Sequence, residues 1–307
     1  MASRWWTYQR ERFPVLGHGT LVLLVSLSAV VYSSHLRGEA SWPDPQTLAV
    51  ASICAFLFFL QLRVLDEWKD YEEDRRYRPY RPVPRGLVML RELSAVGGVA
   101  AAAQLALVVW LGARLVPVLL AVWLYMVLMG KEFFLREWLK ARPIAYLWTH
   151  MLIMPLIYLF LIACDWRGAP APHWTGIGWL LLVGFFNGVV IEIGRKVRAP
   201  QQEEPGVETY SVLWGRRNAV CAWSAAVVLC GAAAGAAEWQ IRVLPIGEWL
   251  IALGLLMTFA AGVCFLAAPS AGRAKLIESA SALWTLLVHL SLGPVALLLS
   301  PWLAARG

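Results

Sequence analysis

Cysteine is scarce in this sequence, and no two cysteines form a recognisable pair. The 307 residues include five, which stand singly in or beside apolar segments: Cys54, Cys164, Cys221, Cys230 and Cys264. Their spacing fits neither a disulfide framework nor a set of metal ligands. This argues against a secreted disulfide scaffold and a cysteine-ligated metal centre, so we interpret these residues as small core side chains.

A cleavable signal peptide is also not evident. Residues 1–12 are polar and basic, but the apolar stretch after them lacks a convincing small-residue cleavage site. We therefore expect this stretch to form the first membrane span. The apolar segments leave no room for a second domain, and we expect one membrane domain over residues 1–307.

Long apolar runs dominate the rest of the chain. Hydrophobic residues make up 59% of it and the mean hydropathy is +0.60, an apolar share above that of soluble domains. A membrane-spanning helix needs about 20 apolar residues, and the runs reach that length. The sequence therefore predicts an all-α polytopic membrane protein with about nine transmembrane helices, near 14–34, 46–65, 91–111, 115–130, 145–163, 175–193, 218–236, 246–268 and 277–300.

The basic residues lie mostly on one side of these spans. All but five of the 27 belong to the N-terminal segment and to the loops after the even-numbered spans; the exceptions are Arg37, Arg114, Arg167, Arg242 and Arg306. By the positive-inside rule, this predicts a cytoplasmic N-terminus and an external C-terminus in a bacterial-type inner or plasma membrane. We attribute the net charge of +7 to the basic residues that set the membrane topology, and we expect some attraction to membrane lipid headgroups. We do not interpret this charge as a sign of nucleic-acid binding.

Three aspartates recur every four residues at the end of the second span. If the helix continues through Asp66, Asp70 and Asp74, they share one face, each about 6 Å further along the axis. Stacked carboxylates suit a hard divalent cation, above all Mg²⁺. The basic residues that follow, among them Arg78 and Arg81, would then meet an anionic ligand.

The alternative interpretation is a solvated juxtamembrane loop, because acids and bases nearly balance here. The strict acid spacing and the series Pro79, Pro82, Pro84 and Gly86, which ends the helix at a defined place, favour the site.

A weaker second motif follows the sixth span. Glu192 lies at the inner end of that span, where an ionisable group needs a cavity or a partner. It also precedes Lys196 by four residues, so a simple helix ion pair is the alternative. Two acid-bearing loops on one side of the membrane could converge on a single ligand.

On these motifs, the chain resembles the UbiA-type superfamily of intramembrane prenyltransferases. Asp70 and Asp74 match the aspartates of that family's first motif, and Asp66 replaces the usual leading asparagine. Glu192 stands at the first acid of the second motif, and Lys196 stands where another acid often sits.

The resemblance implies nine helices around a lipid-facing cavity, with Mg²⁺ (Mn²⁺ is a possible substitute) held by the acidic motifs. Glu203 or Glu204 would supply the missing carboxylate of the second motif, or Lys196 would contact the diphosphate directly. Lys131, Arg78 and Arg81 are further candidates for diphosphate contacts, with positive-inside charge as the alternative.

The implied activity is transfer of an isoprenyl chain from a prenyl diphosphate to a lipophilic acceptor, aromatic or lipid. Cyclisation of the same donor is the second hypothesis, and a non-catalytic isoprenoid-binding protein is the third. The sequence does not give the length of the donor chain, the identity of the acceptor or the oligomeric state.

Overall fold

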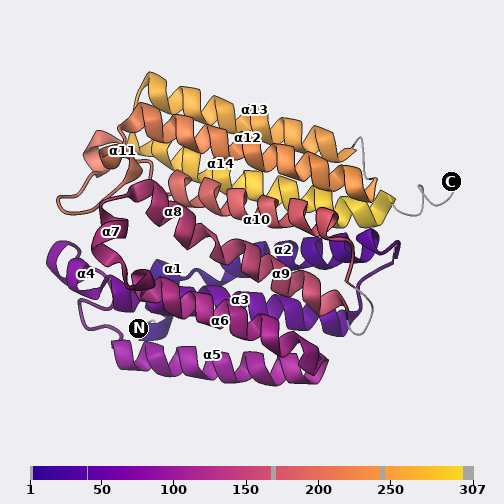
Figure 1. Ribbon diagram of the computed structural model, residues 1–307. Coiled ribbons are helices and arrows are strands. Elements are labelled where there is room, and N and C mark those ends of the chain that lie inside the picture. The colour runs from indigo at the N-terminus through magenta and orange to yellow at the C-terminus, as the bar shows by residue number, and fades with distance from the viewer. Residues whose placement is uncertain (1–2, 40, 167–170, 243–245, 300–307) are drawn as a thin grey trace.

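The computed structural model describes residues 3–39, 41–166, 171–242 and 246–299. Within these ranges all regular elements are helices and no strand occurs (Figure 1). Nine segments there are long and apolar enough to cross a membrane: Val15–Leu36 (α2), Pro45–Lys69 (α3), Leu90–Leu111 (α5), Ala113–Gly130 (η1 and α6), Pro143–Trp166 (α8 and α9), Trp174–Gly194 (α10), Arg216–Ile241 (α12), Ile246–Ala267 (α13) and Ala271–Leu299 (α14 and η4). The predicted fold class and span count are confirmed.

Several of these segments are composite. Ala113–Leu115 (η1) leads into Val116–Gly130 (α6); Pro143–Met151 (α8) and Ile153–Trp166 (α9) make up one span; and Ala271–Leu290 (α14) is followed by the π-helix Ser291–Val295 (η4). The largest boundary difference is in the ninth span, which begins at Ala271 and not at 277. Its predicted end at residue 300, Arg167, Arg306 and the C-terminus lie outside the described residues.

Short helices gather where the chain turns at one end of the bundle. They are Tyr71–Tyr77 (α4), Glu132–Phe134 (η2), Arg136–Lys140 (α7), Pro200–Gln202 (η3) and Tyr210–Leu213 (α11). Figure 1 shows α4, α7 and α11 together at the left-hand end. We call this end, formed by residues 70–89, 131–142 and 195–215, the motif end.

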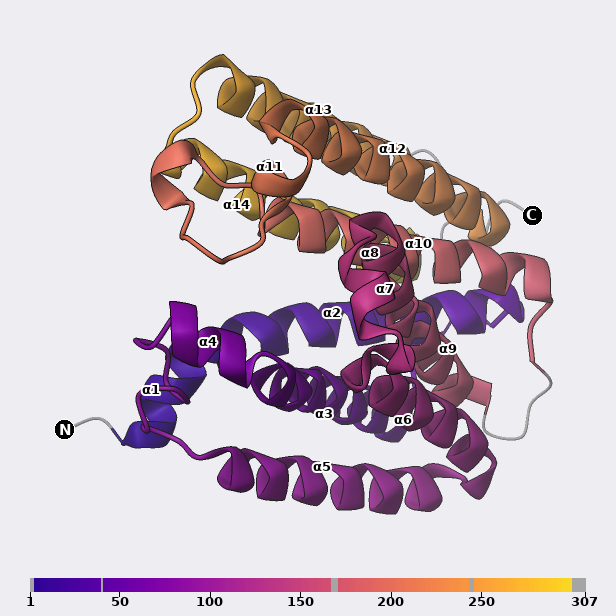
Figure 2. The ribbon, with the colours of Figure 1, turned by 60° about the vertical axis from the view of Figure 1, so that its left-hand side comes forward.

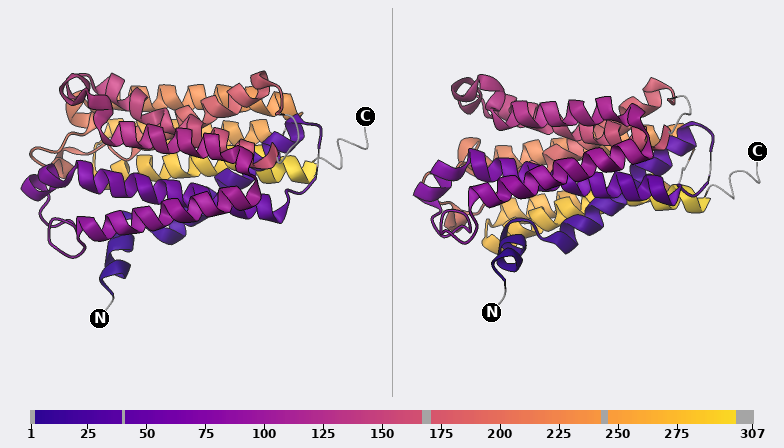
Figure 3. Two further views of the ribbon diagram at one scale, coloured as in Figure 1. Left: turned by 60° about the horizontal axis from the view of Figure 1, so that its bottom comes forward. Right: turned by 90° about the horizontal axis from the view of Figure 1, so that it is seen from below.

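The N-terminal helix Arg4–Arg12 (α1) also lies near the motif end and stands off the side of the bundle (Figure 3). Buried Tyr8 packs in a cluster with Val64 of α3 and Val83. Arg12 pairs with Glu67 of α3 at 2.6 Å, and both side chains are largely buried. These contacts fix the last turns of α3 against the loop that follows α4.

The spans form two groups joined by α8 and α9. Figure 2 shows α2, α3, α5 and α6 on one side and α10, α12, α13 and α14 on the other. Small residues on α10 allow close approach to α9: a Cβ added to Gly184 would lie 2.8 Å from the ring of Tyr158, and one added to Gly188 would lie 2.8 Å from Met154. Membrane helices commonly associate through such small residues.

Buried polar groups on α14 fix this helix against three neighbours. Ser281 accepts a hydrogen bond from Trp223 of α12 at 3.0 Å, and Thr285 donates one to Asn187 of α10 at 2.9 Å. His289 is 2.8 Å from the Tyr158 hydroxyl of α9. Because hydrocarbon offers no alternative partners, such bonds hold the register between helices.

Candidate functional site

The first acidic motif is not one continuous helix. Helix α3 ends at Lys69, Asp70 adopts φ −91° and ψ 1°, and α4 begins at Tyr71. Across this break the backbone hydrogen bonds keep a four-residue register: Asp70 N donates to Asp66 O at 2.9 Å, Asp74 N to Asp70 O at 2.8 Å, and Arg78 N to Asp74 O at 2.8 Å. The expectation of an unbroken helix was wrong, although the spacing that motivated it persists through the bend.

Two of the three aspartates have basic partners within their own motif. Asp74 is 1% exposed and pairs with Arg78 at 2.6 Å and with Arg81 at 2.7 Å. Asp66 lies 3.6 Å from Arg63 and 3.9 Å from Lys69. Arg78 and Arg81, which were proposed from the sequence for diphosphate binding, therefore both form ion pairs with Asp74.

Asp70 differs from its neighbours because its carboxylate has no ion pair or side-chain hydrogen bond with any residue that the structure describes. Burial raises the pKa of this carboxyl group. Lys69 and the more distant Lys196 act in the opposite direction, whereas the like charges of Asp66 and Asp74 raise it further. A partly buried carboxylate without an ion pair in the described chain, at the bend between two helices, is a candidate ligand for a cation.

The second motif sits at the last turn of α10. Glu192 pairs with Lys196 at 2.8 Å, as the sequence spacing suggested, and also with Arg195 at 2.5 Å. Its side chain is 12% exposed. The charge of Glu192 raises the pKa of Arg195, and Asp66 adds to the effect. Arg195 was missed from the sequence, although its position three residues after Glu192 is a helical ion-pair spacing.

The two acidic motifs face each other across the motif end. Lys196 acts electrostatically on Asp70, and Asp66 acts on Arg195. Tyr210 of α11 lies near charged groups of the second motif. Burial is the main cause that raises the pKa of its hydroxyl, and the charge of Glu192 raises it further. The Lys196 ammonium is 5.7 Å from the centre of its ring. Segments about 120 residues apart in sequence thus share one polar site.

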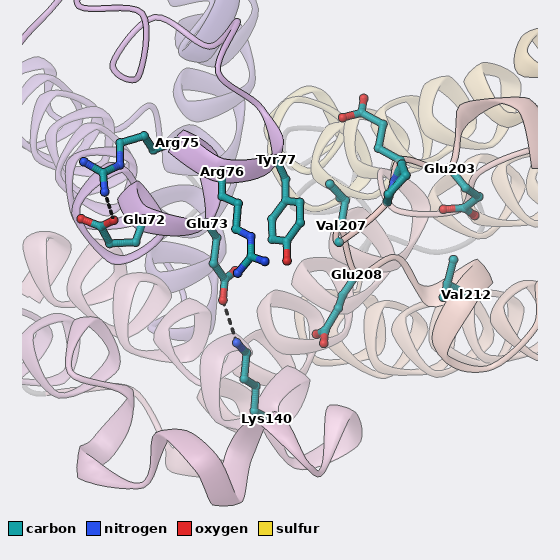
Figure 4. A pocket seen from close by; sticks show the side chains of 13 residues that line it. Glu72, Glu73, Arg75, Arg76, Tyr77, Lys140, Glu203, Val207, Glu208 and Val212 are labelled. Carbon is teal, nitrogen blue, oxygen red and sulfur yellow. Dashed lines mark hydrogen bonds and ion pairs between the residues drawn. The ribbon is translucent and has the colours of Figure 1, made fainter.

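Glu203 and Glu204 lie in a neighbouring cleft. It has a volume of about 1010 Å³ and is lined by α4, α7 and the loop 203–208 (Figure 4). Thr209 donates a hydrogen bond to Glu203 at 2.7 Å, and the Tyr80 hydroxyl donates to Glu204 at 2.9 Å. Asp66, Asp70, Asp74 and Glu192 do not line this cleft, so a metal-ligand role for Glu203 or Glu204 stays a prediction.

The cleft is closed on one side by an ion pair. Lys140 donates to Glu73 at 2.7 Å, and this bond lowers the pKa of the Glu73 carboxyl group. Lys131, at the end of α6, is exposed and pairs with none of the acids within the described chain. The structure therefore does not bring this candidate to the motifs.

Helix α8 adds polar groups that the sequence did not single out. Lys69 donates a hydrogen bond to the Tyr146 hydroxyl at 2.8 Å, and the Tyr146 ring stacks on His150 at 3.8 Å. Both residues sit inside an apolar run, so no charge pattern marks them. Only the tertiary contact between Tyr146 and Lys69, at the end of α3, links them to the acids.

The acidic and basic side chains of the two motifs fit a hard cation that binds together with an anionic ligand. Among the described residues, no three acidic, histidine or cysteine side chains form a metal-binding group by themselves. Mg²⁺ usually takes one or two carboxylates and completes its shell with phosphate oxygens and water. Asp70, with Asp66 and Glu192 as neighbours, supplies such carboxylates, and Lys69, Arg195 and Lys196 supply charge for an anion.

Solved structures with the same fold come from prenyltransferases and their homologues. Digeranylgeranylglyceryl phosphate synthase is 17% identical with a TM-score of 0.63, and the match covers 96% of this chain and 99% of that one. An apo UbiA homologue from Aeropyrum pernix K1 is 12% identical with a TM-score of 0.66, covering 86% and 94%. A UbiA homologue from Archaeoglobus fulgidus, bound to DMAPP and Mg²⁺, is 13% identical with a TM-score of 0.54, covering 93% and 98%.

At these identities the solved structures show the fold alone. A search of curated proteins gave no match. The sequence model of the UbiA prenyltransferase family, however, matches residues 22–282, which include both acidic motifs and all but the ends of the chain. The chain belongs to the UbiA prenyltransferase family.

Proposed function

We propose that this protein transfers an isoprenyl chain from a prenyl diphosphate to an aromatic or lipid acceptor, with Mg²⁺-dependent release of pyrophosphate. Family membership supports prenyl transfer in general. The observation that carries the proposal is the partly buried carboxylate of Asp70, which has no ion pair of its own within the described chain and lies within electrostatic reach of Lys69 and of Lys196 in the second motif. The Archaeoglobus fulgidus homologue bound to DMAPP and Mg²⁺ lends further support.

In this proposal, Asp66, Asp70 and Glu192 would hold Mg²⁺. Mn²⁺ would support the reaction when it is supplied in place of Mg²⁺. When bound, the metal would neutralise charge on the departing pyrophosphate. Lys196, Arg195 and Lys69 surround the same space and would bind the diphosphate oxygens as fixed positive charges. Asp74 would have a supporting role here, because its side chain is only 2% exposed behind Arg78 and Arg81, whereas that of Glu192 is 12% exposed.

Arg78 and Arg81 would hold the bend in place and remain within reach of the diphosphate. Each keeps about a fifth of its side chain exposed, 17% and 20%. Their pairing with buried Asp74 orders the start of the loop 78–89. A bound anion would then compete with Asp74 for these guanidinium groups.

The apolar interior of the bundle would protect the reactive prenyl group. Ionisation of an allylic diphosphate yields a cation that water destroys, so transfer requires a site that excludes water. Spans such as α10 and α12 bury mostly aliphatic and aromatic residues. We place the prenyl chain among the spans below the acidic motifs, in a lipid-facing cavity as the sequence predicted.

We also propose the orientation given by the basic residues: the motif end in the cytoplasm, the N-terminus on the same side, and the described chain acting as one domain. The positive-inside rule supports this, since the motif end holds basic residues such as Arg78, Lys140 and Lys196. The orientation is tested by introducing a cysteine at Arg75, in the motif end, or at Ser41, in the exposed loop between α2 and α3, and measuring its reaction with a membrane-impermeant thiol reagent.

The activity is tested by incubating purified protein with prenyl diphosphates of several chain lengths, with and without Mg²⁺ and lipophilic acceptors. Release of pyrophosphate together with a prenylated acceptor is the expected result. Pyrophosphate release with a cyclic hydrocarbon and no need for an acceptor would indicate a cyclase instead. Tight binding of the donor without any pyrophosphate would indicate a binding protein.

A further inference from the structure

His150 of α8 is a buried histidine with one free ring nitrogen. The residue is 6% exposed. Its Nδ1 lies 2.9 Å from the backbone carbonyl oxygen of Tyr146. A carbonyl oxygen can only accept a hydrogen bond, so Nδ1 donates and the neutral ring keeps its lone pair on Nε2. Nε2 is buried and has no hydrogen-bond partner among the described residues.

Three neighbours fix this ring in place. The Tyr146 ring stacks on it at 3.8 Å and 17°, and Lys69 holds the Tyr146 hydroxyl at 2.8 Å. Phe133 meets the imidazole edge-on at 6.2 Å. Phe133 belongs to a left-handed turn in which Glu132, Phe133 and Phe134 have φ of 49°, 53° and 59°. Left-handed backbone is unfavourable for residues with a side chain, so this turn persists only because its surroundings hold it.

His150 lies between the two acidic motifs. The charged and titratable groups that act on its ring come from each element packed around it: Lys69 and Asp66 from α3, Tyr146 from α8, and Glu192 from α10. The printed contacts link the ring to the first motif: it stacks on Tyr146, whose hydroxyl accepts a hydrogen bond from Lys69, and Lys69 lies 3.9 Å from Asp66.

A buried acceptor without a hydrogen-bond partner destabilises the folded protein. Placing such a nitrogen beside a polar site suggests that a ligand supplies the missing donor. The side chains of Asp66 and Glu192 cannot supply it in their ionised state, since carboxylates only accept. A hydroxyl group on the second substrate can.

We propose that His150 Nε2 binds and deprotonates a hydroxyl group of the acceptor, so that the acceptor is an alcohol or a phenol and the product is a prenyl ether. This inference rests on the proposed prenyl transfer. The bond formed joins C1 of the prenyl chain to the acceptor oxygen. The bond broken joins C1 to the diphosphate oxygen, and its electron pair leaves with pyrophosphate. The hydroxyl proton moves to Nε2.

The chain offers a matched control for this histidine. His35 of α2 also has Nδ1 at 2.9 Å from the carbonyl oxygen four residues earlier, that of Val31, and its Nε2 is likewise buried without a partner. It lies at the end of α2 away from the motif end. Its replacement tests the loss of a similar histidine without touching the site.

The experiment compares His150→Gln, His150→Phe and His35→Phe with the wild-type protein. Gln keeps an oxygen near Nε2 that accepts a hydrogen bond but does not hold the proton, and Phe keeps the stacking on Tyr146. The acceptors are dodecanol and an alkylphenol, with dodecyl methyl ether as the acceptor that lacks a hydroxyl. The rate of ether formation is measured alongside the Kd of a non-cleavable prenyl thiodiphosphate.

We expect both His150 variants to lower kcat for ether formation about 100-fold or more, with the donor Kd changed less than twofold. His35→Phe should keep both values within twofold. Added imidazole should restore ether formation to His150→Ala in a dose-dependent manner, which a structural role would not allow.

Wild-type rates in His150→Gln would overturn the inference, as would a parallel loss of donor binding, or prenylated products made only at carbon. Those results would leave the proposed transfer intact, because the wild-type protein would still release pyrophosphate. If the wild-type protein releases none with any acceptor, the proposed function and this inference fail together.

Discussion

Gly206 packs directly on the ring of Tyr77, and this contact joins the loop after the second acidic motif to the end of α4. Gly206 has φ +76°, and an added Cβ would lie 2.4 Å from Tyr77 Cε1. Nearby, the Tyr80 hydroxyl donates a hydrogen bond to Glu204 at 2.9 Å. The two loops therefore meet over the motif end in the structure.

Gly206→Ala should separate these loops, because a side chain there is both strained at positive φ and in collision with Tyr77. We expect faster proteolysis within residues 199–209 and a loss of stability of about 1 kcal/mol or more. Gly98→Ala is the control, since a Cβ there meets nothing within 4 Å. Equal proteolysis of the two variants would show that the contact is unimportant.

Asp74→Ala should unfold more readily than Asp70→Ala. Removal of Asp74 leaves Arg78 and Arg81 beside each other without their shared carboxylate, and breaking such a buried pair costs about 3 kcal/mol. Asp70 has no ion pair to lose with any residue that the structure describes. Thermal unfolding in detergent measures the difference, and a larger loss of Tm in Asp70→Ala would contradict this assignment of roles.

Glu192→Gln should raise the Mg²⁺ concentration needed for the half-maximal rate, because it removes one candidate metal ligand. Lys196→Ala should mainly weaken binding of the prenyl diphosphate at saturating Mg²⁺. Metal and donor titrations of the initial rate separate these effects. If Glu192, Arg195 and Lys196 form only an ion-pair cluster, both variants will give wild-type kinetics.

The sequence was sufficient for the fold because membrane spans are set by the length of apolar runs. It also indicated the four-residue register of Asp66, Asp70 and Asp74, which is local, whereas their role as metal ligands stays a prediction. It did not reveal the bend at Asp70, since no proline or glycine marks that position. It did not reveal Tyr146 and His150 either, because the contact of Tyr146 with Lys69 and its stacking on His150 are tertiary and leave no local pattern.

The position of Glu203 and Glu204 was also beyond the sequence. Their loop returns to the motif end through contacts with Tyr77 and Tyr80, which are tertiary and more than 120 residues away in the chain. Which of the three aspartates has a basic partner likewise depends on the three-dimensional structure. Spacing alone makes Asp66, Asp70 and Asp74 equivalent, whereas their environments distinguish them.

The central claim is that Asp70 holds a metal ion against the diphosphate of a prenyl donor. The most direct measurement is pyrophosphate release from a prenyl diphosphate, with acceptor present, in Mg²⁺ and in excess chelator. Asp70→Asn is compared with Glu72→Gln, whose native side chain is 73% exposed. We expect release by the wild-type protein and by Glu72→Gln in Mg²⁺, none in chelator, and a loss of at least about 100-fold in Asp70→Asn. Full release in chelator, or equal rates for the two variants, would contradict the account.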